Sequence, residues 1–490
     1  MKKKRPAVAG GDGAGDGDGA PVQVNVDPAS YRDWAALPDD LLLTVMESLA
    51  IPDLFRAGTA CASWYAAYST ARRARIPIRD SAPCLLYSGE GDDDPSTATL
   101  YSPSSGDCFR VRLPDPPLRS RALVGSAHGW LATADERSDL HLVNPLTGAQ
   151  VALPPVTALH NAESFLDEQG SLMYNLYEAV WPDEVKSDPQ KREELEEFLS
   201  PDPAVYRAQK LRMFLYHRVI LSCSPSAGRN CIVLLVHKPD GMISFARLGD
   251  ERWTHINRAT SNGSLKRDIG YTDALYNKND GLFYLLSFDG SICTLDLSGS
   301  NPVARHIMRK KTIWDNPSKY IVLAPWGDLL EVWRLRETEE TDEIPDNASL
   351  DGDSEPDDEI PDNVALDGDS EPDEPDEDRS DRWFTEEIML YKVDIDKQKF
   401  VKMRSIGDHA LFLGFNSVVC LPTKDFPMLK PDCAYLSDEF YEEICGNMHN
   451  WREIGIWDLK NCKLQSLGDV ESLHPWRNWP SPIWITPSLN

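Results

Sequence analysis

Two patterns of hydrophobic and polar positions divide the chain. Between residues 33 and 78, apolar residues recur every three or four positions, which is the spacing of amphipathic α-helices. After residue 83, apolar runs of four to eight residues alternate with Gly, Pro, Asn and Asp, a pattern typical of many short antiparallel strands. We therefore predict a mainly β protein with a small N-terminal α domain.

Three short helices are predicted in the N-terminal block. The first lies in the segment 37–49, the second begins at Ile51, and the third covers residues 60–71. Gly58 weakens the connection between the second and third helices, because glycine has a low helix propensity. The first helix has one broad apolar face, formed by Leu41, Leu42, Val45, Met46 and Leu49. Three short helices cannot bury this much apolar surface by themselves, so the block requires a partner surface.

The β region contains repeated strand and turn units. In the segment 271–297, turns at 279–281 and 289–290 separate three predicted strands, and similar units occupy 141–155 and 232–249. Repeated meanders of about 40–50 residues are typical of a β-propeller, and the region has room for six or seven blades. Six of its tryptophans are predicted to fill the interfaces between blades: Trp130, Trp253, Trp326, Trp333, Trp457 and Trp484.

Charge is concentrated in one segment of the chain. The formal net charge is −29, and residues 337–382 hold 22 acidic residues and two arginines. Within this segment EIPDNASLDGDSEPD at 343–357 returns as EIPDNVALDGDSEPD at 359–373. Such a composition cannot form a packed core, so we expect a disordered acidic loop between two strands of the propeller.

Two further segments are predicted to lie outside the packed domains. Residues 1–30, which begin with a basic run and continue with Gly and Asp, are expected to be disordered. Residues 161–209 form a polar insertion in the propeller, with a short helix predicted over 189–199.

Composition also excludes several classes of function. The acidic balance argues against a nucleic-acid partner, and no apolar run approaches the roughly 20 residues of a membrane helix. The N-terminus lacks the apolar segment of a secretory signal. Ten scattered cysteines without a CxxC pair or a neighbouring histidine cluster argue against a zinc site or a disulfide framework. We expect a soluble intracellular protein with reduced thiols and without a metal, a cofactor or a membrane partner.

Short motifs bear on the location of the protein and on whether it is an enzyme. Residues 2–6, KKKRP, match a basic nuclear-import signal, so we expect the protein in the nucleus, the cytoplasm or both. Ser126 lies close to His128 in the sequence, but no GxSxG turn accompanies them. No phosphate-binding GxxxxGK[ST] loop and no HExxH motif occurs either. We therefore predict no catalytic residue and a protein that is not an enzyme.

The helical block resembles the F-box motif. The order of a Leu-Pro pair, an acidic pair, aliphatic residues at helical spacing and a tryptophan matches without gaps. The resemblance implies that the block binds a Skp-type adaptor, which connects it to a cullin. The residues that it implies for adaptor binding, directly or by support, are Leu37, Pro38, Leu41, Leu42, Val45, Met46, Leu49, Leu54 and Trp64. The alternative is that these residues form only a local helical core.

The region from residue 83 to 490 resembles the plant F-box-associated domain DUF295, a kelch-like β-propeller. The strings that carry the resemblance include GSAHGWLATA at 125–134, NPLTGAQVALPP at 144–155, APWGDLLEVWRL at 324–335 and PIWITPS at 482–488. Together, the two resemblances imply a substrate-recognition subunit of an SCF-type E3 ubiquitin ligase, whose propeller binds an unknown target protein. The alternative is a non-ligase interaction or regulatory protein with a degenerate F-box.

Overall fold

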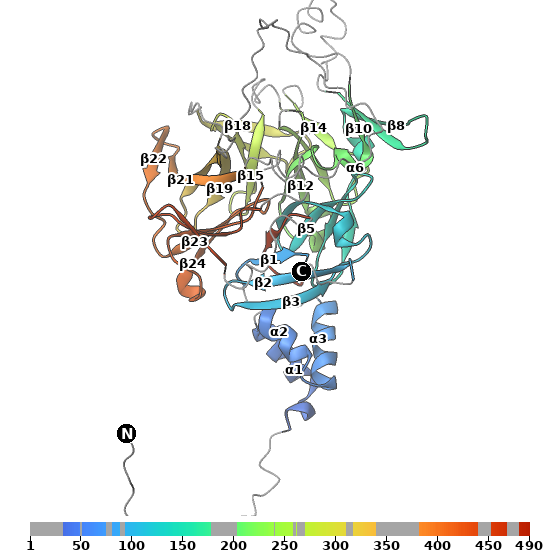
Figure 1. Cartoon of the computed structure of the whole chain (residues 1–490), viewed down its shortest axis with the longest axis vertical. Coiled ribbons are helices and arrows are strands. Elements are labelled where there is room, and N and C mark those ends of the chain that lie inside the picture. The colour runs from blue at the N-terminus through green and yellow to red at the C-terminus, as the bar shows by residue number, and fades with distance from the viewer. Residues whose placement is uncertain are drawn as a thin grey trace, which may run out of the picture.

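The computed structural model of the chain confirms a mainly β fold with N-terminal helices (Figure 1). It describes residues 33–49, 51–74, 81–88, 94–177, 203–239, 241–257, 261, 270–309, 317–339, 382–439, 452–467 and 480–490. The predictions for residues 1–30, the helix at 189–199 and the acidic repeats lie outside these residues. In the described residues, no helix is long and apolar enough to cross a membrane.

The helical block has the three helices that the pattern predicts. A short 3-10 turn, η2 (Trp34–Ala36), precedes α1 (Asp39–Ser48), α2 (Ile51–Gly58) and α3 (Ala62–Ala74). The third helix begins two residues later and ends three residues later than predicted. Trp64 joins it to the preceding turn, because its indole Nε1 donates a hydrogen bond to the Trp34 carbonyl at 3.0 Å.

Gly58 has a different role from the one predicted. A Cβ atom at this position would lie 2.8 Å from ring carbons of Tyr68, well inside ordinary contact distance. The missing side chain therefore lets the end of α2 approach the Tyr68 ring on α3, and Gly58 tightens the connection between the helices instead of weakening it.

Six four- or five-stranded sheets form the blades of the propeller. Blade 1 holds β4 (Ala122–Ala127), β5 (Trp130–Ala134), β6 (Leu140–Val143) and β7 (Gln150–Ala152). Blade 2 holds β11 (Tyr216–Leu221), β12 (Ile232–His237), β13 (Met242–Arg247) and β14 (Thr254–Ile256). Blade 3 holds β15 (Tyr271–Asn277), β16 (Leu282–Ser287), β17 (Ile292–Asp296) and β18 (Val303–Met308).

The remaining blades complete the ring. Blade 4 holds β19 (Ser318–Leu323), β20 (Leu329–Glu339), β21 (Arg382–Asp394) and β22 (Lys399–Met403). Blade 5 holds β23 (His409–Leu413), β24 (Val419–Pro422), β25 (Cys433–Leu436), β26 (Gly455–Asp458) and β27 (Lys463–Gln465). Blade 6 holds β28 (Ile483–Ile485), β1 (Cys84–Tyr87), β2 (Thr97–Ser102) and β3 (Asp107–Arg112). Of the two predicted blade numbers, the described residues therefore support six.

Blade 6 closes the ring with strands from both ends of the β region. Its innermost strand β28 pairs antiparallel with β1, and Trp484 lies opposite Leu85. Trp484 also packs edge to face on Phe412 of blade 5, with ring centroids 5.1 Å apart. The last described strand, β28, thus connects β1, β2 and β3 to blade 5. Closure of the ring therefore depends on the C-terminal segment.

The segment predicted as a polar insertion contributes a separate small sheet. It contains β8 (Ala162–Leu166), β9 (Leu172–Leu176) and β10 (Ala204–Arg207), followed by the short helix α6 (Ala208–Leu211). This sheet projects beside blades 1 and 2 (Figure 1). It is not purely polar, because Tyr174 and Leu176 are buried in the same core cluster as residues of both blades.

Most sequence predictions for individual strands are confirmed. The hairpins at 141–155, 232–249 and 271–297 are all present. Four short 3-10 helices connect strands: η3 (Leu118–Ser120), η4 (Val156–Ala158), η5 (Pro225–Asn230) and η6 (Thr423–Asp425). None of the nine cysteines that the structure describes is in a disulfide.

One of the six tryptophans is less buried than the others. Trp130, Trp253, Trp333, Trp457 and Trp484 are buried, as predicted, but Trp326 is 41% exposed. Trp326 lies in the turn between β19 and β20, where its indole Nε1 donates to Asp328 at 2.9 Å and its ring packs on His409. Because His409 belongs to β23 of blade 5, the Trp326 ring contacts the neighbouring blade as predicted, but its turn position leaves it partly exposed.

Candidate functional site

The predicted adaptor-binding residues fall into a buried group and a surface group. Leu42, Met46 and Leu54 are fully buried in the core of the helical block, so their role is to support the helices. Leu41 is 49% exposed and Pro38 is also exposed. The remaining four are half-buried: Leu37, Val45, Leu49 and Trp64.

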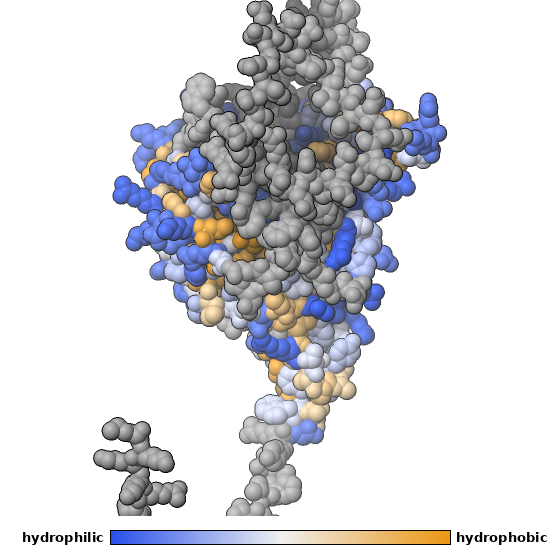
Figure 2. All heavy atoms as spheres, viewed as in Figure 1, coloured by the Kyte–Doolittle hydropathy of each residue, from blue (hydrophilic) through white to orange (hydrophobic). Residues whose placement is uncertain are grey.

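The surface group lies where the block is free of the propeller. Trp34, just before α1, is 61% exposed and is a second large apolar side chain at the surface of the block. Figure 2 shows apolar residues at the end of the block that points away from the propeller. Exposed aromatic and aliphatic side chains of this size on one small domain are typical of a surface that binds another protein.

The opposite side of the block packs on blade 6. The Phe55 ring of α2 stacks on Phe109 of β3, with ring centroids 5.7 Å apart, and Arg56 forms an ion pair with Asp107. Apolar residues of the helices and of β1, β2 and β3 belong to one core cluster. The propeller therefore supplies part of the partner surface that the helices require, while Leu41 of α1 stays exposed.

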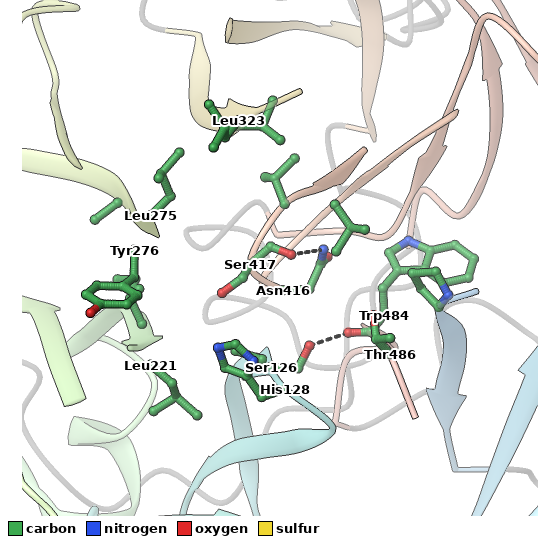
Figure 3. Close-up of a pocket in the computed structure, with 17 residues that line it drawn as sticks. Ser126, His128, Leu221, Leu275, Tyr276, Leu323, Asn416, Ser417, Trp484 and Thr486 are labelled. Atoms are coloured by element: carbon green, nitrogen blue, oxygen red, sulfur yellow. Dashed lines mark hydrogen bonds between the residues drawn. The ribbon is translucent and has the colours of Figure 1, made fainter. Parts of the chain in front are cut away.

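A central cavity of about 350 Å³ lies where the innermost strands end (Figure 3). Its lining comes from all six blades and includes Leu221, Leu275, Leu323, Val418 and Trp484. None of the residues that line it is Asp, Glu, Lys or Arg. An uncharged cavity of this kind fits an apolar group better than a charged ligand.

The polar groups in the cavity hold the ring together. The Ser126 hydroxyl donates a hydrogen bond to the Trp484 carbonyl, which joins blade 1 to blade 6. The Asn416 side-chain amide donates to the carbonyls of Phe412 and Ser417 at 3.1 and 2.9 Å. Burial lowers the pKa of His128, which keeps its imidazole neutral. Because Ser126 donates to a carbonyl, it is not placed as a nucleophile activated by His128.

Sequence reasoning did not identify this cavity. It used the strings at 125–134 and 482–488 only as evidence of resemblance, although both contribute lining residues. A cavity on the axis of a ring combines single residues from strands far apart in the chain, so no local spacing marks it.

These features define a class of protein: a six-bladed β-propeller with an N-terminal helical block docked on its closing blade. Residues 100–458 match the family described as the KIB1-4 beta-propeller, and the match covers well over half of the chain. The protein therefore belongs to the KIB1-4 β-propeller family.

Similar proteins from Arabidopsis thaliana are F-box proteins. The putative F-box protein At2g33190 is 22% identical over 444 residues, which cover 87% of this chain and 91% of that protein. The F-box protein At5g25290 is 26% identical over 151 residues, and the F-box/kelch-repeat protein At1g57790 is 34% identical over 139 residues. These matches cover 30% and 27% of this chain, and only 35% and 36% of the two relatives. The resemblance to plant F-box proteins with a C-terminal propeller is confirmed.

Proposed function

We propose that this protein is the substrate-recognition subunit of an SCF-type E3 ubiquitin ligase. The helical block binds a Skp-type adaptor and through it a cullin, while the propeller binds the target protein. The observation that carries the proposal is the division of the block, which packs on blade 6 through Phe55 and Arg56 and leaves Leu41 and Trp34 exposed.

The propeller has the features of a binding module. Its central cavity is uncharged, and its Ser126 and Asn416 side chains are engaged in hydrogen bonds that stabilise the ring. The protein is therefore a non-catalytic subunit in this proposal, and ubiquitin transfer belongs to other subunits of the ligase.

A three-component binding experiment tests the proposal. Immobilised full chain is incubated with a purified Skp-type adaptor and a cullin, each alone and together. We expect the adaptor to be retained alone and the cullin only in its presence. The double variant Leu41→Asp/Val45→Asp should retain neither protein, because it places two charges on the apolar face of α1. Failure of the wild-type chain to retain the adaptor would favour an interaction protein with a degenerate F-box.

For location, we propose that residues 2–6 direct the protein to the nucleus as well as the cytoplasm. The basic run KKKRP supports this proposal. Fusion of residues 1–20 to a cytosolic reporter should increase its nuclear fraction, and replacement of the four basic residues by alanine should abolish the increase. A reporter with an unchanged distribution would contradict nuclear import by this segment.

A further inference from the structure

Three histidines from separate elements meet beside blade 2. His160 lies between η4 and β8, His237 ends β12, and His255 is in β14. One ligand atom of each ring lies within 4.8 Å of the ligand atoms of the other two. The rings of His160 and His255 are stacked with centroids 3.6 Å apart, and the His237 ring is 6.0 Å from that of His160.

The hydrogen bonds of His237 show which of its two ring nitrogens carries the proton. Its Nδ1 lies 2.7 Å from the Lys238 carbonyl, which can only accept, so Nδ1 carries the proton. Its Nε2 lies 2.9 Å from the Ser244 hydroxyl and accepts from it. Histidines that bind metals characteristically donate one ring N–H to a carbonyl and keep the other nitrogen for the metal. His237 therefore has the tautomer of a metal ligand, but the Ser244 hydroxyl must release Nε2 before a metal can bind there.

His160 supplies an independent indication of a ligand. Both of its ring nitrogens are buried and have no hydrogen-bond partner in the described part of the chain. A buried polar atom without a hydrogen-bond partner costs free energy of folding. Such an atom usually contacts a bound ion or a water molecule.

We propose that His160, His237 and His255 form a binding site for a divalent transition metal, with Zn²⁺ as the physiological ion. Three neutral imidazoles without a carboxylate suit zinc and its neighbours, whereas Mg²⁺ and Ca²⁺ require oxygen ligands. The fourth coordination position is left for water. Tetrahedral bonds of about 2.0–2.1 Å place ligand nitrogens roughly 3.3 Å apart. Because the rings of His160 and His255 are stacked, the His160 ring must rotate out of the stack before both rings can direct a nitrogen at one ion.

The site has a structural consequence that is separate from the adaptor surface. His160 immediately precedes β8 of the inserted sheet, and His237 and His255 belong to blade 2. A shared metal would fasten the connection from blade 1 to the inserted sheet onto blade 2. No short ligand spacing marks this cluster, because the three residues are far apart in the chain.

Titration of the full chain, first freed of metal with a chelator, tests the site. We expect wild type to bind one equivalent of Co²⁺ with the visible absorption of a tetrahedral nitrogen site and without a thiolate charge-transfer band. Zn²⁺ should displace the Co²⁺ and raise the melting temperature. The variant His160→Phe keeps an aromatic ring against His255 but lacks ligand atoms. It should weaken metal binding by about 100-fold and lose the Zn²⁺-dependent rise in melting temperature.

A matched variant separates this site from other histidines. His141 on β6 is half-buried and lies outside the cluster, so His141→Ala should bind metal like wild type. If His160→Phe proves unstable, His255→Gln serves as the second ligand variant with the same expected loss. Absence of stoichiometric binding by wild type would overturn the proposal, as would binding that either ligand variant retains at full affinity.

Discussion

Phe55 of α2 stacks on Phe109 of β3, with the two ring planes only 17° from parallel. This contact joins the helical block to the closing blade of the propeller, and Tyr68 of α3 packs on the other side of Phe55 with ring centroids 5.9 Å apart. Phe55 therefore contributes to the orientation of the exposed α1 surface relative to the propeller, together with the Arg56–Asp107 ion pair and the shared apolar core.

Phe55→Ala should loosen the block without removing its adaptor-binding surface. Loss of the aromatic contacts should destabilise the docked helices by about 1–3 kcal/mol. Hydrogen exchange of the α1–α3 amides should become faster, while exchange in blades 2–4 stays unchanged. Leu166→Ala, at an exposed position of β8, is the control and should leave helix exchange unaltered. Unchanged helix exchange in Phe55→Ala would show that this contact does not hold the block.

Gly58→Ala should destabilise the protein, although alanine is the better helix former by about 1 kcal/mol. The added methyl group would lie 2.8 Å from the Tyr68 ring, and such overpacking typically costs about 1–3 kcal/mol. Denaturant unfolding measures the difference. At Gly299 an added Cβ meets only one atom within 4 Å, at 3.8 Å, so Gly299→Ala is the matched control and should be nearly neutral. A more stable Gly58→Ala would mean that propensity outweighs packing here.

A buried ion network joins blades 4 and 5. Arg334 of β20 contacts Glu453 at 2.6 Å and Glu439 at 3.2 Å, and Arg336 contacts Glu439 at 2.7 Å. Burial alone would raise the pKa of Glu439, but the guanidinium groups of Arg334, Arg336 and Arg218 outweigh it and lower the pKa to about 2. Glu439 thus contributes stability above its ordinary pKa near 4.5, and this contribution is lost as the pH falls from 4.5 towards 2.

Glu439→Gln should therefore cost stability in a pH-dependent way. At pH 7 the variant removes a charged partner of Arg336 and one of the two carboxylates that Arg334 contacts, and breaking a buried ion pair typically costs about 3–5 kcal/mol. Its deficit relative to wild type should shrink as the pH falls from 4.5 towards 2, because Glu439 of the unfolded wild-type chain takes up a proton in this range while the folded chain does not. Glu387→Gln removes an exposed partner of Lys402 and should cost at most about 1 kcal/mol at any pH. A deficit of Glu439→Gln that stays constant between pH 7 and 3 would contradict the assigned role of this carboxylate.

Because β28 closes the ring, we predict that the propeller does not fold without its last residues. A chain that ends at residue 479 lacks the partner of β1 and the buried Trp484. It should fail to give a cooperative thermal transition. Replacement of residues 340–381 by an Asn-Gly turn removes more residues but should change the free energy of unfolding little, because Glu339 and Arg382 are already cross-strand partners. Calorimetry of both chains checks the contrast, and a normally folded chain that ends at 479 would refute the closure.

Local patterns predicted the helices and hairpins, because the residues that decide them are neighbours in the chain. The apolar face of α1 and the turn at 289–290 are examples. Features that depend on distant pairs were missed. Gly58 is explained only by Tyr68, and the β23–β25 pairing in blade 5 is parallel, which no turn signal marks. The cavity likewise combines residues of all six blades, and the three histidines combine blade 2 with the connection before β8.

The central claim is that the exposed side of α1 binds a Skp-type adaptor, and calorimetric titration of the full chain with the purified adaptor tests it most directly. We expect a one-to-one complex. Leu41→Ala should weaken the affinity by about 5- to 30-fold, because loss of a central apolar contact costs about 1–2 kcal/mol. Met428→Ala, at a 65% exposed apolar position of the propeller, should bind like wild type. No heat of binding with wild type, or equal affinities for wild type and Leu41→Ala, would contradict the claim.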